Sequence, residues 1–199
     1  MSEAEHSAEA GRGPVRLLLV SGSTRGGSTN TSALRTALQV APAGVEAVLY
    51  DGLSELPAFN PDDELDGDVV HPAVASMRAA FAAAEAVLIC TPEYAGTLPG
   101  SLKNLLDWTV GNGDLYEKPV AWLNVAPVGR GDGAEATLMT VLGYVTADVI
   151  EPACRRVTVP RGAVGPDGAI ADGELRAALA DVLETMAGAV RGPRILDGR

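Results

Sequence analysis

The sequence has few of the residues that build metal centres, disulfide frameworks or nucleic-acid surfaces. Its 199 residues include two His and two Cys, and 26 Asp and Glu outnumber 15 Lys and Arg. His6 and His71 are too few for a histidine-based metal site, and Cys90 and Cys154 do not form a metal-ligand spacing, so we expect no metal. We expect both Cys to be buried free thiols, which suits a reducing cytoplasm.

Charge and the length of the apolar runs exclude two kinds of partner. A formal net charge of −11 disfavours nucleic acid and anionic membrane surfaces, since both would repel it. The apolar runs are far shorter than the roughly 20 residues that span a bilayer. The polar N-terminus has no apolar signal-peptide region. We expect residues 1–14 to be a disordered tail and residues 15–199 to form one domain.

Apolar runs alternate with helical segments along the chain, and the stretch 51–68 between two of them is rich in loop-forming residues. This alternation predicts a five-stranded parallel sheet with helices on both faces. If the strand order is 2-1-3-4-5, strands one, three and four are neighbours. The strands are expected at 15–21, 45–50, 86–90, 119–125 and 155–159, and the helices at 31–39, 72–83, 100–109, 134–146 and 173–190.

Residues 21–31, SGSTRGGSTNT, connect the first strand to the first helix and are dense in small polar side chains. Hydroxyls, glycine N–H groups and a helix N-terminus together suit a phosphate. The stretch lacks the Gly-Lys-Ser/Thr ending of a Walker A motif and the Gly-x-Gly-x-x-Gly spacing of a dinucleotide site. A monophosphate cradle and a flexible turn with a good N-cap both remain open, because they use the same residue types.

Two further loops of unusual composition, 91–98 and 127–133, also leave the carboxyl ends of strands. In such sheets ligands bind beyond these ends, where the strand order reverses, so the three loops are expected to converge. The prediction is a flat aromatic ligand with one phosphate. In the second loop Tyr94 could face the ring or cover the core. Glu93 could be a solvated carboxylate or a cap for the nearby helix start.

Three stretches, at 22–30, 91–108 and 129–134, carry a resemblance to one known family. That family is the NADPH-dependent FMN reductases. Residues 22–30, GSTRGGSTN, resemble that family's G-S-x-R-x-x-S-x-N phosphate loop. TPEY at 91–94, followed by PGSLKNLLDW at 99–108, resembles its P-E-Y-N … P-G-x-L-K-N-x-x-D-W segment. GRGDGA at 129–134 is similar to its third, Gly-rich flavin loop.

The resemblance implies a flavodoxin-like three-layer α/β sandwich that binds FMN. One departure is Ala95, where the family commonly has Asn or His, so ring contact there must come from backbone. The helix residues Lys103, Asn104, Asp107 and Trp108 are expected to be structural. The residues implied for the phosphate are Ser23, Arg25, Ser28, Asn30 and Thr31, and those implied for the flavin ring are Pro92, Glu93, Tyr94, Ala95, Gly96 and Gly129.

The implied function is an FMN-dependent oxidoreductase. It would transfer hydride from NADPH or NADH through bound FMN to a flavin, quinone, azo compound or similar small acceptor. FMN carries this chemistry, so no catalytic residue is assigned. A homodimer or homotetramer is implied as well.

Three alternatives are weighed against this function. A flavodoxin-type electron carrier suits the acidity and the fold, but the first loop has Arg25 in place of a carrier's Thr-rich pattern. A non-catalytic flavin-binding subunit or sensor lacks the support of an appended domain. The flavin-supplying reductase component of a two-component monooxygenase is a variant of the main interpretation.

Overall fold

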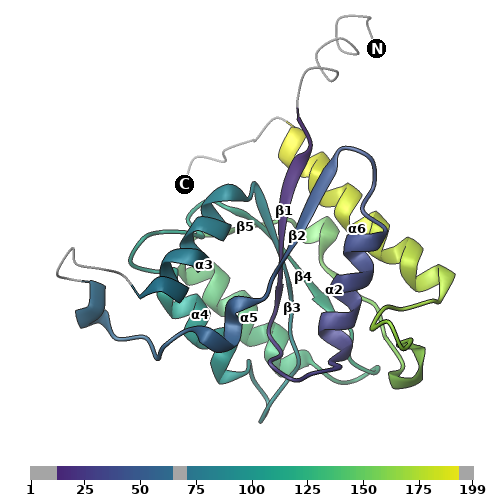
Figure 1. Cartoon of the computed structure of the whole chain (residues 1–199), viewed down its shortest axis with the longest axis horizontal. Helices are drawn as coiled ribbons and strands as arrows, with labels where there is room; N and C mark the ends of the chain where they lie inside the picture. Colours follow the sequence, from purple (N-terminus) through teal and green to yellow (C-terminus); the bar gives the residue numbers. More distant parts are fainter. Residues whose placement is uncertain (1–12, 65–70, 193–199) are drawn as a thin grey trace, which may run out of the picture.

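The computed structural model describes residues 13–64 and 71–192 of the chain. The expected disordered tail therefore lies almost wholly outside the described residues. Parallel strands form one sheet in the order β2-β1-β3-β4-β5, as predicted (Figure 1). The main strands are β1 (Val15–Ser21), β2 (Val45–Tyr50), β3 (Ala86–Cys90) and β4 (Pro119–Asn124).

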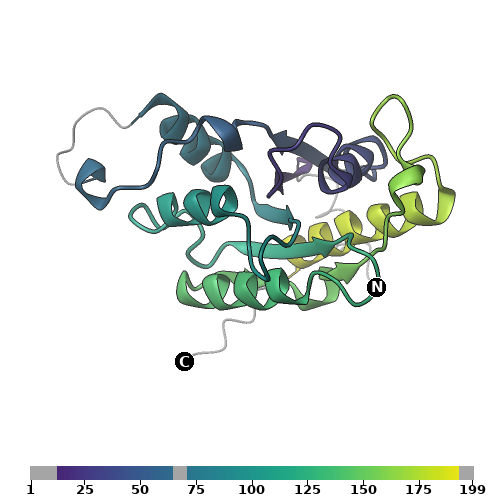
Figure 2. The ribbon, with the colours of Figure 1, turned by 90° about the horizontal axis from the view of Figure 1, so that it is seen from below.

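Helices cover both faces of the sheet and make the predicted three-layer sandwich. One face carries α2 (Thr29–Gln39) and α6 (Gly173–Arg191), and the other carries α3 (Pro72–Ala83), α4 (Gly100–Trp108) and α5 (Asp132–Tyr144) (Figures 1 and 2). Two apolar cores follow from this arrangement, one on each face. Every residue of β3 is buried, as expected for a central parallel strand.

Local signals in the sequence explain where several helices begin. Pro72 occupies the first turn of α3, and the exposed His71 caps it by accepting a hydrogen bond at Nδ1 from the Ala73 N–H at 3.2 Å. Asp172 caps α6 in the same way through the Leu175 N–H at 2.9 Å. His71 is therefore a surface residue at the entry to a helix.

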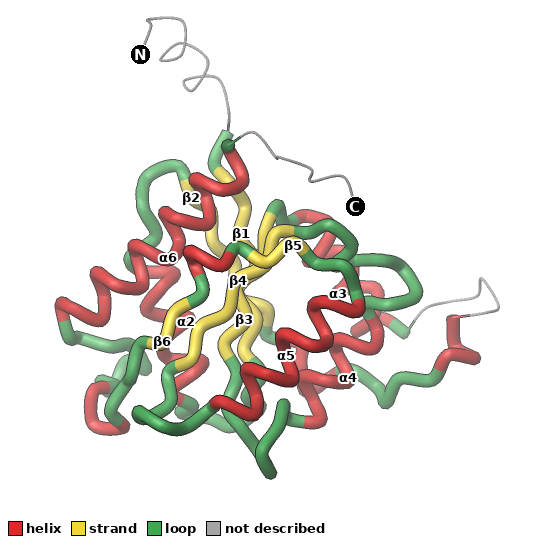
Figure 3. Tube along the Cα trace, turned by 180° about the vertical axis from the view of Figure 1, so that it is seen from behind, coloured by secondary structure: helices red, strands yellow, loops and turns green. Residues whose placement is uncertain are grey.

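The last strand differs from the prediction of one strand at 155–159. Two short segments, β5 (Asp148–Val149) and β6 (Arg155–Arg156), both pair in parallel with β4 (Figure 3). The 3₁₀ turn Glu151–Ala153 separates them. Pro152 lies in this turn and has no N–H to donate, so the ladder is interrupted there.

The loop after β2 is fastened to α4. It contains the 3₁₀ turns Gly52–Glu55 and Pro61–Glu64, and residues 65–68 of the predicted loop lie outside the described residues. The Asn104 amide donates to the Pro57 carbonyl and accepts from the Phe59 N–H, both at 2.7 Å. The Trp108 indole also donates to the Pro57 carbonyl at 3.0 Å. A structural role for Asn104 and Trp108 is thus confirmed.

No helix in the described part of the chain is long and apolar enough to cross a membrane.

Candidate functional site

The first loop, residues 22–28, leaves β1 and folds over the beginning of α2. The Ser21 hydroxyl, at the end of β1, lies 2.8 Å from the Thr31 hydroxyl in the first turn of α2. The Ser23 N–H donates to Ser21 Oγ at 3.3 Å, and Ser23 Oγ accepts from the Arg25 N–H at the same distance. These bonds fold the loop locally and place two of the predicted phosphate residues, Ser23 and Thr31, at its two ends.

The N-terminus of α2 fits a phosphate by the chemistry of its donors. Ser28 is the N-cap residue, yet its side chain makes no cap hydrogen bond, so the first-turn N–H groups keep their donor capacity. Arg25 is exposed and bonds to the Gly27 carbonyl at 3.2 Å, which keeps one positive charge on the loop. Uncapped N–H groups, hydroxyls and a single cation form a suitable donor set for a monophosphate.

Close packing joins the first loop to the second at Gly22. A Cβ built on Gly22 would lie 2.3 Å from Thr91 Oγ1 and 2.9 Å from Leu102 Cδ2. Only glycine lets the end of β1 approach the end of β3 this closely. The predicted convergence of these two loops is therefore present.

Asn30 lies under the first loop rather than on its open side. It is 7% exposed, accepts a hydrogen bond from the Cys90 thiol at 3.3 Å and donates to Ser28 Oγ at 3.5 Å. Its predicted direct contact with phosphate stays a prediction, and the contacts present are those of a support for Ser28. Burial raises the pKa of the Cys90 thiol far above its ordinary value, so Cys90 acts here as a neutral donor.

The second loop contains a tight turn at its tip. Tyr94 and Thr97 exchange backbone hydrogen bonds at 3.0 and 3.1 Å. The two central residues, Ala95 and Gly96, both have positive φ angles, 52° and 78°. This is the pattern of a type I′ turn, which suits Gly and Asn and is strained at Ala. Tyr94 is 51% exposed, so its ring does not cover the core.

Glu93 contacts the N-terminus of α5. Its Oε2 accepts hydrogen bonds from the Gly133 N–H at 2.7 Å and the Ala134 N–H at 3.2 Å. The carboxylate is thus neither solvated nor a cap for the nearby helix α4, as the sequence had suggested, but a cap for α5, 40 residues further along the chain. The carboxylate is already bonded to α5. The predicted contact of Glu93 with the flavin ring therefore stays a prediction for its backbone alone.

The third loop, 127–133, is held at its base by Asn124, a residue that the sequence did not single out. Asn124 ends β4, is 8% exposed, accepts from the Ala126 N–H at 3.0 Å and donates to the Arg130 carbonyl at 3.4 Å. Gly129 and Gly131 have φ angles of 77° and 90°. The sequence did contain a signal for this residue, because Asn124 is a lone amide side chain at the end of an apolar strand.

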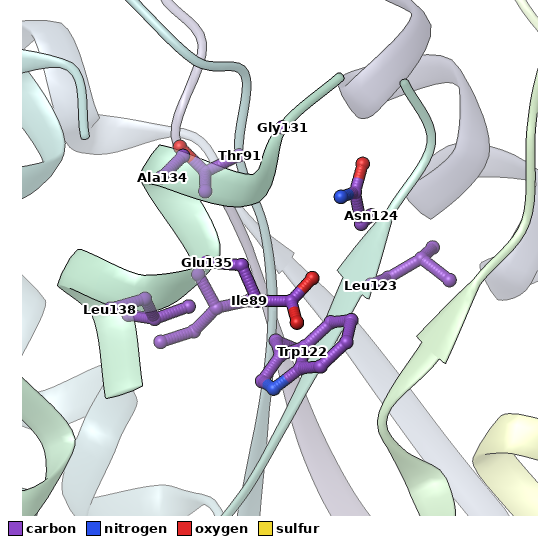
Figure 4. Close-up of a pocket in the computed structure, with 9 residues that line it drawn as sticks. All are labelled: Ile89, Thr91, Trp122, Leu123, Asn124, Gly131, Ala134, Glu135 and Leu138. Carbon is purple, nitrogen blue, oxygen red and sulfur yellow. The ribbon is translucent and has the colours of Figure 1, made fainter. Parts of the chain in front are cut away.

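A small cavity lies beneath the second and third loops, between β3, β4 and α5 (Figure 4). Its volume is about 10 Å³, which is room for a single water and far too small for a flavin. Glu135 reaches into it from α5 above Trp122 of β4. The Glu135 carboxylate is paired with the Arg156 guanidinium at 2.8 Å. A ring would have to lie outside this cavity, on the open side of the loops.

The predicted site residues therefore fall into two groups. Those on the first loop lie at the N-terminus of α2. On the second loop, Glu93 and Gly96 contact Gly133 at the N-terminus of α5. The described residues contain no cluster of three or more His, Cys, Asp or Glu placed to hold a metal ion. The arrangement can bind a phosphate at one end and present backbone groups and Tyr94 to a planar group at the other.

The order of the parallel strands and the helices on both faces of the sheet define a flavodoxin-like α/β protein. The chain belongs to the NADPH-dependent FMN reductase family, whose model matches residues 15–158. This result confirms the family predicted from the motifs.

Curated relatives match over part of their length. The chain is 40% identical over 94 residues to an NAD(P)H-dependent FMN reductase of Pseudomonas aeruginosa, over 47% of this chain and 49% of that protein. It is 38% identical over 96 residues to a probable NADPH:quinone oxidoreductase of Oryza sativa, over 47% of each. The chain thus spans about half the length of the curated relatives that it matches.

Solved structures match over most of the chain. The flavoenzyme FerB, an NAD(P)H:(acceptor) oxidoreductase from Paracoccus denitrificans, has a TM-score of 0.74 at 24% identity, covering 88% of this chain and 97% of that one. A flavodoxin from the Archaea has a TM-score of 0.53 at 12% identity, covering 86% and 99%. These likenesses confirm the flavodoxin-like fold.

Proposed function

We propose that the protein is an NAD(P)H-dependent reductase that uses FMN to reduce a small acceptor. The observation that carries this proposal is the uncapped N-terminus of α2 at the end of a hydroxyl-rich loop, which packs at Gly22 against Thr91 of the second loop. The bound flavin would supply the redox chemistry, passing a hydride equivalent from nicotinamide to the acceptor. The protein's own groups hold and orient it.

The first loop holds the phosphate in this proposal. Ser23, Ser28 and Thr31 offer hydroxyls, the first turn of α2 offers N–H groups, and Arg25 neutralises charge. Asn30 supports Ser28 from below through the contacts described above. No proton donor or nucleophile is required of the protein.

The second and third loops receive the flavin ring. Pro92, Ala95 and Gly96 would offer backbone along the ring, and Tyr94 would flank it with an exposed side chain. Gly129 would approach the far edge, because its positive φ angle and lack of a side chain leave the backbone accessible.

Quinones, azo compounds and free flavins are the proposed acceptors. The names of relatives support these classes: an Escherichia coli quinone reductase is 33% identical over 95 residues, and a Bacillus NADPH azoreductase is 40% identical over 87 residues. A site at the exposed edge of the sheet is open to acceptors of different shapes.

Anaerobic titration of the FMN-loaded protein with NADPH and then NADH tests the proposal. We expect FMN to bind and either nicotinamide to bleach its visible absorbance rapidly, with the faster donor identifying the preferred cofactor. Binding without bleaching would favour the flavodoxin-type carrier. Failure to bind FMN would exclude both functions. Turnover of free FMN in excess of the bound equivalent would show that free flavin is an acceptor, which supply of reduced flavin to a monooxygenase requires.

A homo-oligomer is also proposed. Exposed apolar side chains lie on the second and third loops and on α5, among them Tyr94 at 51%, Val128 at 94% and Met139 at 37% exposure. Light scattering of the purified protein measures the oligomeric state directly. A cytoplasmic location stays a prediction, which the free thiols of Cys90 and Cys154 suit.

A further inference from the structure

We infer that Glu93 is a positioning residue, which locks the second loop to the third and thereby pre-forms the surface that receives the flavin ring. This inference rests on the proposed function. Glu93 is separated from its partners Gly133 and Ala134 by 40 and 41 positions. Both partners lie outside the family motif that contains Glu93.

The first support is the geometry of the carboxylate. Glu93 Oε2 accepts from the N–H groups of Gly133 and Ala134 at 2.7 and 3.2 Å, at the start of α5. The N-cap residue of α5 is Gly131, which has no side chain that could accept from these N–H groups. Glu93 therefore supplies the cap from another loop, and a negative charge at a helix N-terminus is favourable.

Two more contacts make the same connection. A Cβ built on Gly133 would lie 2.1 Å from the Gly96 carbonyl oxygen, so the turn of the second loop rests directly on the start of α5. Beside it, the Thr97 and Thr137 hydroxyls are 2.9 Å apart. The turn with its strained Ala95 is thus held at several points against one helix end.

This connection fixes the relative position of the two loops before a ligand arrives. When only part of a population has the binding-competent arrangement, the apparent dissociation constant rises in inverse proportion to that fraction. Loss of a helix cap shifts such an equilibrium by about tenfold. The first loop is built separately on α2, so its phosphate contacts should not change.

The experiment compares FMN with riboflavin, which lacks the phosphate, in the full-length protein. We expect Glu93→Ala to raise both dissociation constants about tenfold and to leave their ratio unchanged. Glu93→Gln keeps an acceptor oxygen at the same reach and should restore both constants to within about threefold of wild type. The matched control is Glu184→Ala, which removes an exposed carboxylate from α6 in the opposite layer.

Two further readouts separate positioning from general stability. The visible circular dichroism of the bound flavin should change in Glu93→Ala and return in Glu93→Gln. Amide hydrogen exchange at Gly133 and Ala134 should accelerate in Glu93→Ala even without flavin. If Glu93→Ala does not fold, Glu93→Asp carries the test, because the shorter carboxylate should give losses between those of Ala and Gln.

Unchanged dissociation constants in a folded Glu93→Ala protein would overturn the inference. So would a changed ratio of FMN to riboflavin binding, which would place Glu93 in the phosphate site, or a Gln variant no better than Ala. A wild-type protein that binds no flavin would instead refute the proposed function, and the hydrogen exchange of Gly133 and Ala134 would still decide whether Glu93 caps α5.

Discussion

The Cys90 thiol donates a hydrogen bond to the Asn30 side chain over 3.3 Å, and this contact ties the end of β3 to the first turn of α2. Cys90 is fully buried and Asn30 is 7% exposed. The thiol keeps its proton because burial raises its pKa. The oxygen of Asn30 is therefore fixed toward Cys90, and its amide nitrogen toward Ser28.

The raised pKa of Cys90 predicts a loss of stability in alkali. The unfolded chain releases the thiol proton above the ordinary value of 9.0, whereas the native state keeps it, so unfolding becomes more favourable as pH rises. We expect this group to contribute a loss of about 1 kcal/mol in the free energy of unfolding between pH 9 and 10. Urea unfolding at each pH gives the free energy of unfolding of wild type and of Cys90→Ala. The contribution of the thiol is the difference between the two proteins in how steeply this free energy falls with pH. Parallel slopes would contradict the prediction.

Ala95 predicts a stabilising substitution. Its φ angle of 52° is costly for a residue with a Cβ and free for glycine. We expect Ala95→Gly to raise the free energy of unfolding by about 0.5–1 kcal/mol. The control is Ala136→Gly on the exposed side of α5, where the same change should cost about 1 kcal/mol. Equal effects in the two variants would show that the turn is not strained.

Gly133 predicts a position that tolerates no side chain. Its Cβ would meet the backbone oxygen of Gly96 at 2.1 Å, so Gly133→Ala must push the second loop away from α5. We expect a loss of about 2 kcal/mol or more in stability. Gly143→Ala in the same helix meets nothing within 4 Å and should be neutral or stabilising. Chemical denaturation of both variants checks this contrast, and a harmless Gly133→Ala would mean that the two loops are not in contact.

Arg25 predicts a contribution specific to the phosphate. Arg25→Ala, which removes this charge, should weaken FMN binding about tenfold. It should leave riboflavin binding within about twofold of wild type, because riboflavin has no phosphate to interact with the charge. The FMN effect should shrink at high salt, since Arg25 is exposed. Arg16→Ala, an exposed change at the amino end of β1, is the control. A loss that is equal for both flavins would place Arg25 against the ring.

The sequence alone predicted the five helices, the first four strands and the order of the sheet, but not the division of the last strand into two short segments. Continuous apolar runs such as 86–90 can only be buried central strands, and parallel strands joined by helices have few possible arrangements. The predicted phosphate loop could be proposed from the sequence, because all its groups lie within 11 consecutive residues and depend on one strand–helix junction.

Only the tertiary structure decided which side chains hold the site together. The contacts Glu93–Gly133, Cys90–Asn30 and Asn124–Arg130 each depend on where a strand end lies relative to another segment. A Glu after a strand has the same local signature whether it faces solvent, a ligand or a distant helix N-terminus. The break of the last strand at Pro152 has a local cause, but the pairing of both of its pieces with β4 follows from packing of the whole sheet. Spatial proximity between distant segments, which no local pattern encodes, gave these residues their roles.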